Sequence, residues 1–403
     1  MAITPIHEPA RPAPPRSSLP WQPGHPVWQL GFRPFYLLAA LFAAVSIPLW
    51  LASYMGVAAG PLQVSMGWHM HEMVFGFAVA VVVGFLFTAG RNWTGLPTPQ
   101  GWHLMALVAV WLAGRVAMLA ASAPVAAAID MVFLPLSAWP LFLVLHRSGN
   151  HRNLFLVGLL VLLTLANGLY HAAVMDVLAL SYFVPVQAAI FIIVLIESVL
   201  GARVIPMFTR NGALGSTPVA GPKRALVAVG LMAAAGVAWI TGAPGIVTAP
   251  LALAAGAMSL ANLLAWQPQR TLRVPLLWIL HLSYAWIGIG FALLAAASLH
   301  WLPASAAFHA LTVGSMAGLI IGMMTRTTLG HTGRPLKAGA SEAAMYWLVQ
   351  LGAVARLLAA VSPASLVMPA LLAAGVSWSV AFILYAVTYA PYLWRPRVDG
   401  REG

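Results

Sequence analysis

The sequence predicts an all-α polytopic membrane protein with about twelve transmembrane helices. Of its 403 residues, 61% are hydrophobic and only 7% are charged, and the mean hydropathy is +0.89. In soluble domains about a quarter of the residues are charged, so this composition is typical of a chain that lies in a bilayer. The chain contains no cysteine, which excludes disulfides and metal sites built from thiolates.

The transmembrane helices are predicted from apolar runs of the length that a bilayer requires. A crossing needs about 20 mostly apolar residues, and short turns rich in Gly, Pro, Thr and Asn separate runs of this length. The runs begin near Pro34, Trp68, Trp102, Pro124, Asn153, Tyr182, Lys223, Gly245, Val274, Ala304, Ser341 and Ala364.

The predicted domains are one transmembrane domain and two tails. Residues 1–32 are rich in Pro, Arg and Ser and lack the apolar core of a signal peptide, so we expect a disordered cytoplasmic tail. Residues 33–395 form the transmembrane domain, and residues 396–403 form a cytoplasmic C-terminal tail.

Basic residues predict the orientation of the chain, because Lys and Arg are retained on the cytoplasmic side. They occur near both ends and in every second loop, whereas the loop at residues 55–67 has none. This distribution accounts for the net charge of +12 without a nucleic-acid partner. Both termini are therefore expected in the cytoplasm. Arg115 and Arg356 differ from the other basic residues because they lie inside the third and eleventh spans.

The second and tenth spans share an internal repeat. A shift of 238 residues aligns six identical positions, which are His71, Gly76, Gly84, Thr94, Gly95 and Pro97 with His309, Gly314, Gly322, Thr332, Gly333 and Pro335. A looser copy, GARVIPMFTRNGALGSTP, ends the sixth span, so the repeat unit is expected to be four helices. The alternative is that the glycines only reflect close helix packing in lipid.

Several polar side chains are expected near the non-cytoplasmic ends of their spans. At 1.5 Å per residue, Arg115 and Arg356 also reach this outer third. Ionisable groups inside a bilayer are functional candidates, and Arg115 could pair with Asp130 of the fourth span or with an anionic cofactor. The histidines at this depth are His71, His171 and His309.

These residues predict a heme site. Two helices that each provide an imidazole at the same depth can hold a porphyrin between them. We expect His71 and His309 to ligate heme b, and Arg115 and Arg356 to pair with its propionates. Glu72 is the expected orienting partner of an imidazole. The alternative for any single buried histidine is a hydrogen-bonded core residue.

A second metal and a proton relay are further expectations. His69, His171 and His300 lie near Met66, Met70 and Met175 at the outer surface, and mixed imidazole and thioether ligands suit copper. The methionines could instead be ordinary packing residues. In the inner half, His281 is a further candidate metal ligand, and Glu197 and Arg203 could relay protons or form an ion pair.

The chain also resembles the NnrS family. The resemblance rests on WHMHEMVFGF, GFLFTAGRNWTG, RVIPMFTRN, LHLSYAW and HALTVGSMAGLIIGMMTRTTLGHTGRP, and it extends from Gly31 to Arg395. It implies a twelve-helix protein of the bacterial inner membrane that contains heme and copper and takes part in the nitric oxide response. It does not say which residues hold which metal.

The twelve spans are also similar to the catalytic subunit of heme-copper oxidases and nitric oxide reductases, where histidines of spans two and ten hold a heme. This chain departs from that pattern because span seven lacks a His-His pair and span six has no histidine. Reduction of O2 at a three-histidine copper is therefore not expected.

Three function classes remain open from the sequence. The first is a heme protein, with or without copper, that binds or detoxifies nitric oxide or iron-nitrosyl species during nitrosative stress. The second is a transporter or a metal or NO sensor. The third is a heme protein that transfers electrons from a quinol or another redox partner. Whether the protein is an enzyme stays open, and the lipid bilayer is a partner in all three.

Overall fold

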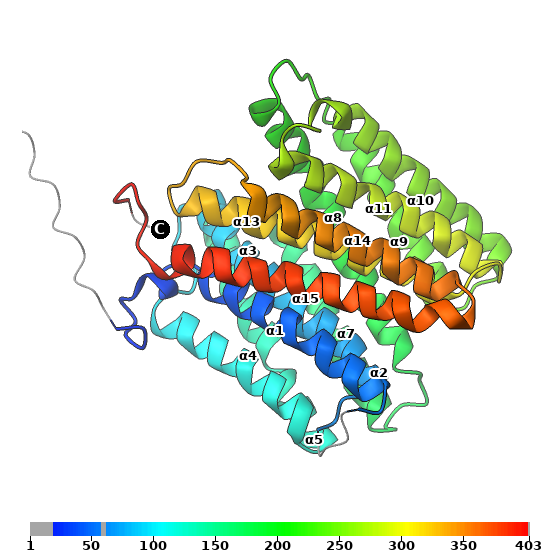
Figure 1. Cartoon of the computed structure of the whole chain (residues 1–403). Coiled ribbons are helices and arrows are strands. Elements are labelled where there is room, and N and C mark those ends of the chain that lie inside the picture. The colour runs from blue at the N-terminus through cyan, green and yellow to red at the C-terminus, as the bar shows by residue number, and fades with distance from the viewer. Residues whose placement is uncertain (1–18, 58–61, 402–403) are drawn as a thin grey trace, which may run out of the picture.

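The structure is a computed structural model that describes residues 19–57 and 62–401, and every regular element in these ranges is a helix (Figure 1). Twelve helical spans are long and apolar enough to cross a membrane, which confirms the predicted class and number. Each span begins within two residues of its predicted start. The predicted N-terminal tail lies outside the described residues up to position 18, and residues 19–31 form turns and a short helix, η1 (Pro26–Trp28).

Eight spans are single helices and four are interrupted. The single helices are α1 (Phe32–Tyr54), α4 (Trp102–Ala120), α8 (Phe183–Gly212), α9 (Pro222–Ile240), α10 (Gly245–Ala265), α11 (Pro275–Ser298), α14 (Ala340–Val361) and α15 (Ala364–Trp394). The short helix η4 (Pro268–Arg270) connects α10 to α11. The interrupted spans are α2–η2–α3 (Met66–His71, Glu72–Ala78, Val79–Thr94), α5–α6 (Ala123–Asp130, Phe133–Arg147), η3–α7 (His151–Asn153, Leu154–Val174) and α12–η5–α13 (Ala304–His309, Ala310–Ala317, Gly318–His331).

The second and tenth spans contain matching π-helical segments. The segment η2 follows His71 directly, and η5 follows His309 directly, 238 residues later. A π segment is rare because it widens the helix by one residue per turn, and it occurs frequently at functional sites. The sequence repeat therefore has a counterpart in the local backbone of these two spans.

The same two spans lie at the centre of the bundle. In their most apolar windows, 89% of the second span and 78% of the tenth are buried, compared with 28% for the seventh. The repeated glycines pack against neighbouring helices, since a Cβ at Gly84 would lie 3.0 Å from Phe35 and one at Gly322 would lie 2.8 Å from Leu280. Close helix packing thus accounts for these two glycines.

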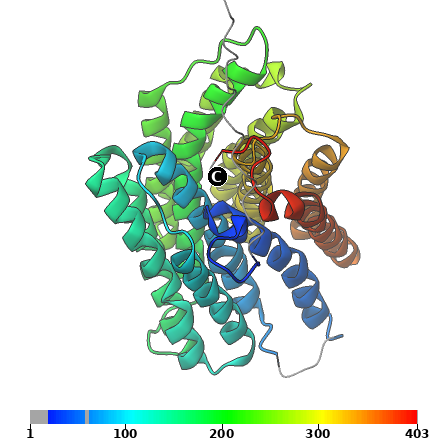
Figure 2. The same ribbon diagram turned by 90° about the vertical axis from the view of Figure 1, so that its left-hand side faces the viewer.

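Both described ends of the chain lie on one face of the bundle, which we call the terminal face (Figure 2). Arg33 at the start of α1 donates hydrogen bonds to the carbonyl oxygens of Leu393 and Arg395 at the end of α15, at 2.9 and 2.8 Å. The second and tenth spans begin at the opposite face, which we call the far face. A cytoplasmic location of the terminal face stays a prediction.

Candidate functional site

A cavity of about 310 Å³ lies between the spans near the far face. Its wall is mostly apolar, with Met70, Met73 and Met316 among the lining side chains. Its ionisable lining residues are His69 of α2, His309 of α12 and Arg356 of α14, and we call it the histidine cavity. Apolar cavities with a few convergent polar groups are typical binding sites.

His309 has one ring nitrogen fixed by the backbone. Its Nδ1 lies 2.7 Å from the carbonyl oxygen of Ser305, one turn earlier on α12. A carbonyl oxygen only accepts, so Nδ1 carries the hydrogen, and in the neutral ring Nε2 carries the lone pair. Histidines that ligate metals are commonly held in this way, because the bond fixes both tautomer and ring orientation.

His69 is held by stacking. Its ring lies against the indole of Trp50 at a centroid distance of 4.1 Å and an interplanar angle of 19°. Its Nδ1 is buried and has no hydrogen-bond partner among the described residues. A buried ring nitrogen without a partner is costly, so this imidazole is a candidate for a ligand that would supply one.

Arg356 adds a positive charge to the histidine cavity. No carboxylate of the described residues forms an ion pair with it. A guanidinium at membrane depth is unfavourable unless an anion faces it. The cavity therefore offers two imidazoles for a metal and one cation for an anionic group.

A second polar site is buried on the other side of α2, and we call it the charge cluster. Its six residues come from four spans and are at most 5% exposed; they are His71, Glu72, Arg115, Asp130, Asn167 and His171. Arg115 donates to Glu72 Oε1 at 2.5 Å and to Asp130 Oδ1. Asp130 ends α5 at the break in the fourth span, so the interruption places its carboxylate here.

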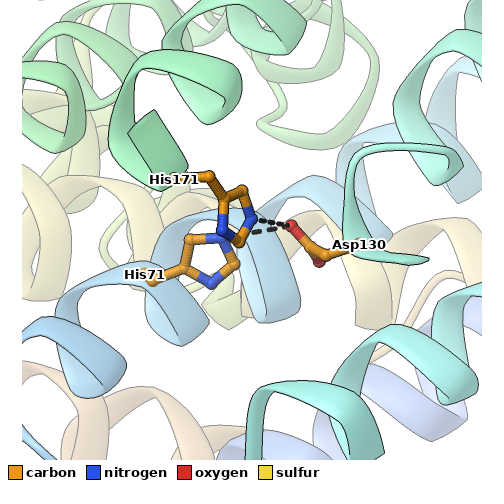
Figure 3. A group of neighbouring side chains, drawn as sticks. All are labelled: His71, Asp130 and His171. Atoms are coloured by element: carbon orange, nitrogen blue, oxygen red, sulfur yellow. Dashed lines mark hydrogen bonds and ion pairs between the residues drawn. The ribbon is translucent and has the colours of Figure 1, made fainter. Parts of the chain in front are cut away.

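His71 and His171 converge on the same oxygen of Asp130 (Figure 3). The distances from Nε2 to Asp130 Oδ2 are 3.2 Å for His71 and 3.1 Å for His171. One ligand atom from each of the three residues lies within 4.8 Å of the other two, a separation that could hold a metal ion. Another cavity of about 310 Å³, separate from the histidine cavity, lies beside the cluster and is lined by His171 and by residues 63–65.

The formal charges of the charge cluster do not balance. Glu72 and Asp130 provide two negative charges, and Arg115 provides one positive charge. Burying a net charge is costly unless it is compensated. Either a protonated His71 or a bound cation would reduce this imbalance.

The structure does not bring His71 and His309 together. His71 is fully buried and is not among the described residues that line the histidine cavity. Its Nδ1 lies 2.8 Å from Glu72 Oε1 and its Nε2 lies 2.9 Å from Asn167 Oδ1, so both nitrogens already face oxygen atoms. The histidine of α2 that shares a cavity with His309 is His69.

The structure also gives Arg115 a different partner from the expected propionate. Its guanidinium is held by Glu72 and Asp130, the alternative that the sequence had left open for Asp130. Glu72 contacts His71, with Oε1 2.8 Å from Nδ1, so its predicted role as an orienting partner stays a prediction with a contact that fits it. The sequence analysis did not predict Asn167 as a site residue. The feature that could have indicated it is an amide side chain inside an otherwise apolar span.

The expected outer copper group is divided between the two sites. Met66, Met70 and His69 line the histidine cavity, whereas His171 belongs to the charge cluster. His300 is exposed in the turn after α11. Met175 follows the end of α7 and is partly buried.

The inner polar residues lie in separate places. His281 is buried, with Nδ1 3.0 Å from the carbonyl oxygen of Leu277 and Nε2 3.1 Å from Thr209 Oγ1. Arg203 donates to Asn153 Oδ1 at 2.7 Å. Glu197 accepts a hydrogen bond from Ser315 of η5 at 3.4 Å, and no ion pair joins it to Arg203 among the described residues.

Comparison with known proteins supports the family resemblance. A search of curated proteins finds no match to this chain. A family model described as NnrS protein matches residues 26–397, which is nearly the whole chain and includes both polar sites. The chain therefore belongs to the NnrS family.

Proposed function

We propose that the protein is a heme protein of the nitric oxide response, and that the histidine cavity is its heme site. One observation carries the proposal: a single apolar cavity is lined by His69, His309 and Arg356, and the guanidinium of Arg356 has no carboxylate partner among the described residues. Heme needs imidazole ligands for its iron, apolar walls for its ring and cations for its propionates. The lining residues provide each of these.

The two histidines are suited to different roles. His309 is the better candidate for a permanent ligand, because the bond from Nδ1 to Ser305 leaves Nε2 to bind iron. His69 lacks such an anchor on Nδ1 and would be the less firmly held of the two imidazoles. Heme iron supplies the chemistry of binding a small gas such as nitric oxide at an accessible position.

Membership in the NnrS family fits a membrane protein of the nitric oxide response. Binding or detoxification of nitric oxide or iron-nitrosyl species is the function we favour. Transport, sensing and electron transfer from a quinol are the competing functions. The bacterial inner membrane, with both termini in the cytoplasm, is the proposed location.

A second candidate is a copper ion at the charge cluster. His71, Asp130 and His171 offer three ligand atoms within 4.8 Å of one another, and imidazole is a good copper ligand. A copper ion would also offset the excess negative charge of the cluster. The competing interpretation is a hydrogen-bonded network in which His71 carries the compensating proton.

The test is an absorption spectrum of purified protein before and after anaerobic addition of nitric oxide, with metal analysis of the same sample. A Soret band that shifts with nitric oxide supports gas binding at heme. A Soret band that does not respond favours electron transfer. A colourless protein from heme-replete cells would exclude both and leave transport or sensing.

A further inference from the structure

Glu197 lines the second of two cavities that lie along the same three spans. The second, which we call the carboxyl cavity, has a volume of about 80 Å³ and lies closer to the terminal face. Spans two, six and ten line both cavities. Along the second span, Phe77 lines the histidine cavity and Val81 the carboxyl cavity, four residues later and therefore about 6 Å away.

The sixth and tenth spans give a similar separation. On α8, Ile190 lines the histidine cavity and Ile196 the carboxyl cavity, a difference of about 9 Å. On the tenth span, Met316 and Leu319 are three residues apart. Three to six residues thus separate the cavities, about 5 to 9 Å along a helix, and Glu197 directly follows Ile196 in the lining of the carboxyl cavity.

The carboxylate of Glu197 is only partly satisfied. Oε2 accepts from Ser315, whereas Oε1 is buried and has no partner among the described residues. Ser315 lies in η5, the π segment that begins directly after His309. Met316, the next residue, lines the histidine cavity, so Ser315 joins Glu197 to a residue adjacent to the wall of that cavity.

The carboxyl cavity is otherwise apolar. The titratable groups that line it are Glu197 of α8 and Tyr36 of α1. Its volume is sufficient for more than one water molecule, and each water needs polar partners, which the hydroxyl of Tyr36 and Oε1 of Glu197 could provide, since neither has a partner among the described residues. A carboxyl group that is protonated at this depth avoids the cost of a buried charge and can pass its proton to water.

We propose that Glu197 carries protons between the terminal face and the histidine cavity. It receives a proton through the carboxyl cavity and releases one toward Ser315 and the histidine cavity. Each passage moves one proton and no electron, so the side chain returns to its starting state. The inference deepens the proposed function, because it assigns the route by which protons reach the cavity where the chemistry would take place.

The first test uses infrared spectroscopy and requires no cofactor. Purified protein should show the carbonyl stretch of a neutral carboxylic acid, which shifts when H2O is replaced by D2O. Glu197→Gln should lose this band. Glu342→Gln is the matched control, because Glu342 is another buried carboxylate and lines neither cavity in the described part of the chain. Loss of the band in neither variant, or only in the control, would overturn the proposal.

The route of proton entry is tested with two matched substitutions, each of which places a larger side chain in one of the two cavities. Val204 lines the carboxyl cavity and Val313 lines the histidine cavity, and both are partly buried. Val204→Phe should slow the deuterium shift of the Glu197 band roughly tenfold or more, because it fills space that water needs, whereas Val313→Phe should not. Slowing by Val313→Phe alone, or by neither variant, would contradict entry through the carboxyl cavity.

A last test addresses the connection between Glu197 and the histidine cavity. In protein that contains heme, electrochemical reduction adds an electron to the cavity, and the Glu197 band should change in response; Glu197→Gln should lack that change. A band that does not respond would overturn this connection. If no heme is found, the proposed function fails, while the exchange measurements still decide whether Glu197 takes up protons through the carboxyl cavity.

Discussion

His69 and His71 are two residues apart on α2, yet their side chains belong to two different sites. His69 lines the histidine cavity together with His309, and His71 contacts Asp130 in the charge cluster. Successive residues of an α-helix are rotated by about 100°, so a spacing of two places side chains on nearly opposite faces. The motif HMH therefore serves two sites at once.

The first prediction separates these histidines by their effect on heme. His309→Ala and His69→Ala should each remove or shift the Soret band, because each removes an imidazole from the cavity. His71→Gln should keep the band. The measurement is the absorption spectrum at equal protein concentration, with His300→Ala as the control at an exposed site. Loss of heme in His71→Gln and its retention in His69→Ala would favour the pair His71 and His309.

The second prediction concerns Arg356. Arg356→Gln removes the cation that has no carboxylate partner in the described part of the chain. Heme affinity should fall about tenfold or more, because a charge-assisted hydrogen bond to a carboxylate contributes about 1.5–3 kcal/mol. Arg356→Lys keeps the charge and should retain more heme. Equal heme in all three proteins would show that no propionate lies beside this residue.

The third prediction concerns copper at the charge cluster. His171→Ala and Asp130→Asn should lower the copper content of purified protein, because each removes one of the three converging ligand atoms. Heme content should change less, since neither residue lines the histidine cavity in the described chain. The control is His281→Ala, whose imidazole is buried elsewhere. Copper that is equal in all variants would leave the protonated hydrogen-bonded network as the explanation.

The fourth prediction tests the ion pairs by stability. Arg115→Met leaves Glu72 and Asp130 buried without their cation, and breaking a buried ion pair costs about 3–5 kcal/mol. Thermal unfolding in detergent should show a clear fall in the transition temperature. Arg203→Met is the comparison, because Arg203 is only partly buried and bonds to a neutral amide. A larger fall for Arg203→Met would contradict the importance of the charge cluster.

The fifth prediction tests the packing of a repeated glycine. A Cβ at Gly314 would lie 2.5 Å from the indole of Trp286, so Gly314→Ala should destabilise the protein by about 1–3 kcal/mol. Gly158 in α7 has no neighbour within 4 Å of such a Cβ. Gly158→Ala should therefore stabilise by up to about 1 kcal/mol, because alanine favours the helix. Thermal unfolding of both variants gives the comparison, and equal shifts would argue against tight packing at Gly314.

The sequence predicted the depth of the site residues in the membrane but not the contacts that they make between spans. Depth along a span is read from position, so the sequence could place His309 and Arg356 at one level. It could not show that Asp130, at the end of α5, accepts a hydrogen bond from Asn167 of the next span, because contacts between spans are not local properties of a segment. Nor could it show that Glu72 and Arg115 compensate one another across two spans.

The sequence by itself determined the number and the starting points of the twelve described spans, because hydropathy and length are local properties of each segment. It also predicted that the second and tenth spans are related, and both contain a π segment directly after the aligned histidine. Only the tertiary structure decided that His69, and not His71, shares a cavity with His309. The reason is that the rotation of a helix about its axis is set by packing against its neighbours, and in an apolar span many rotations look equally favourable.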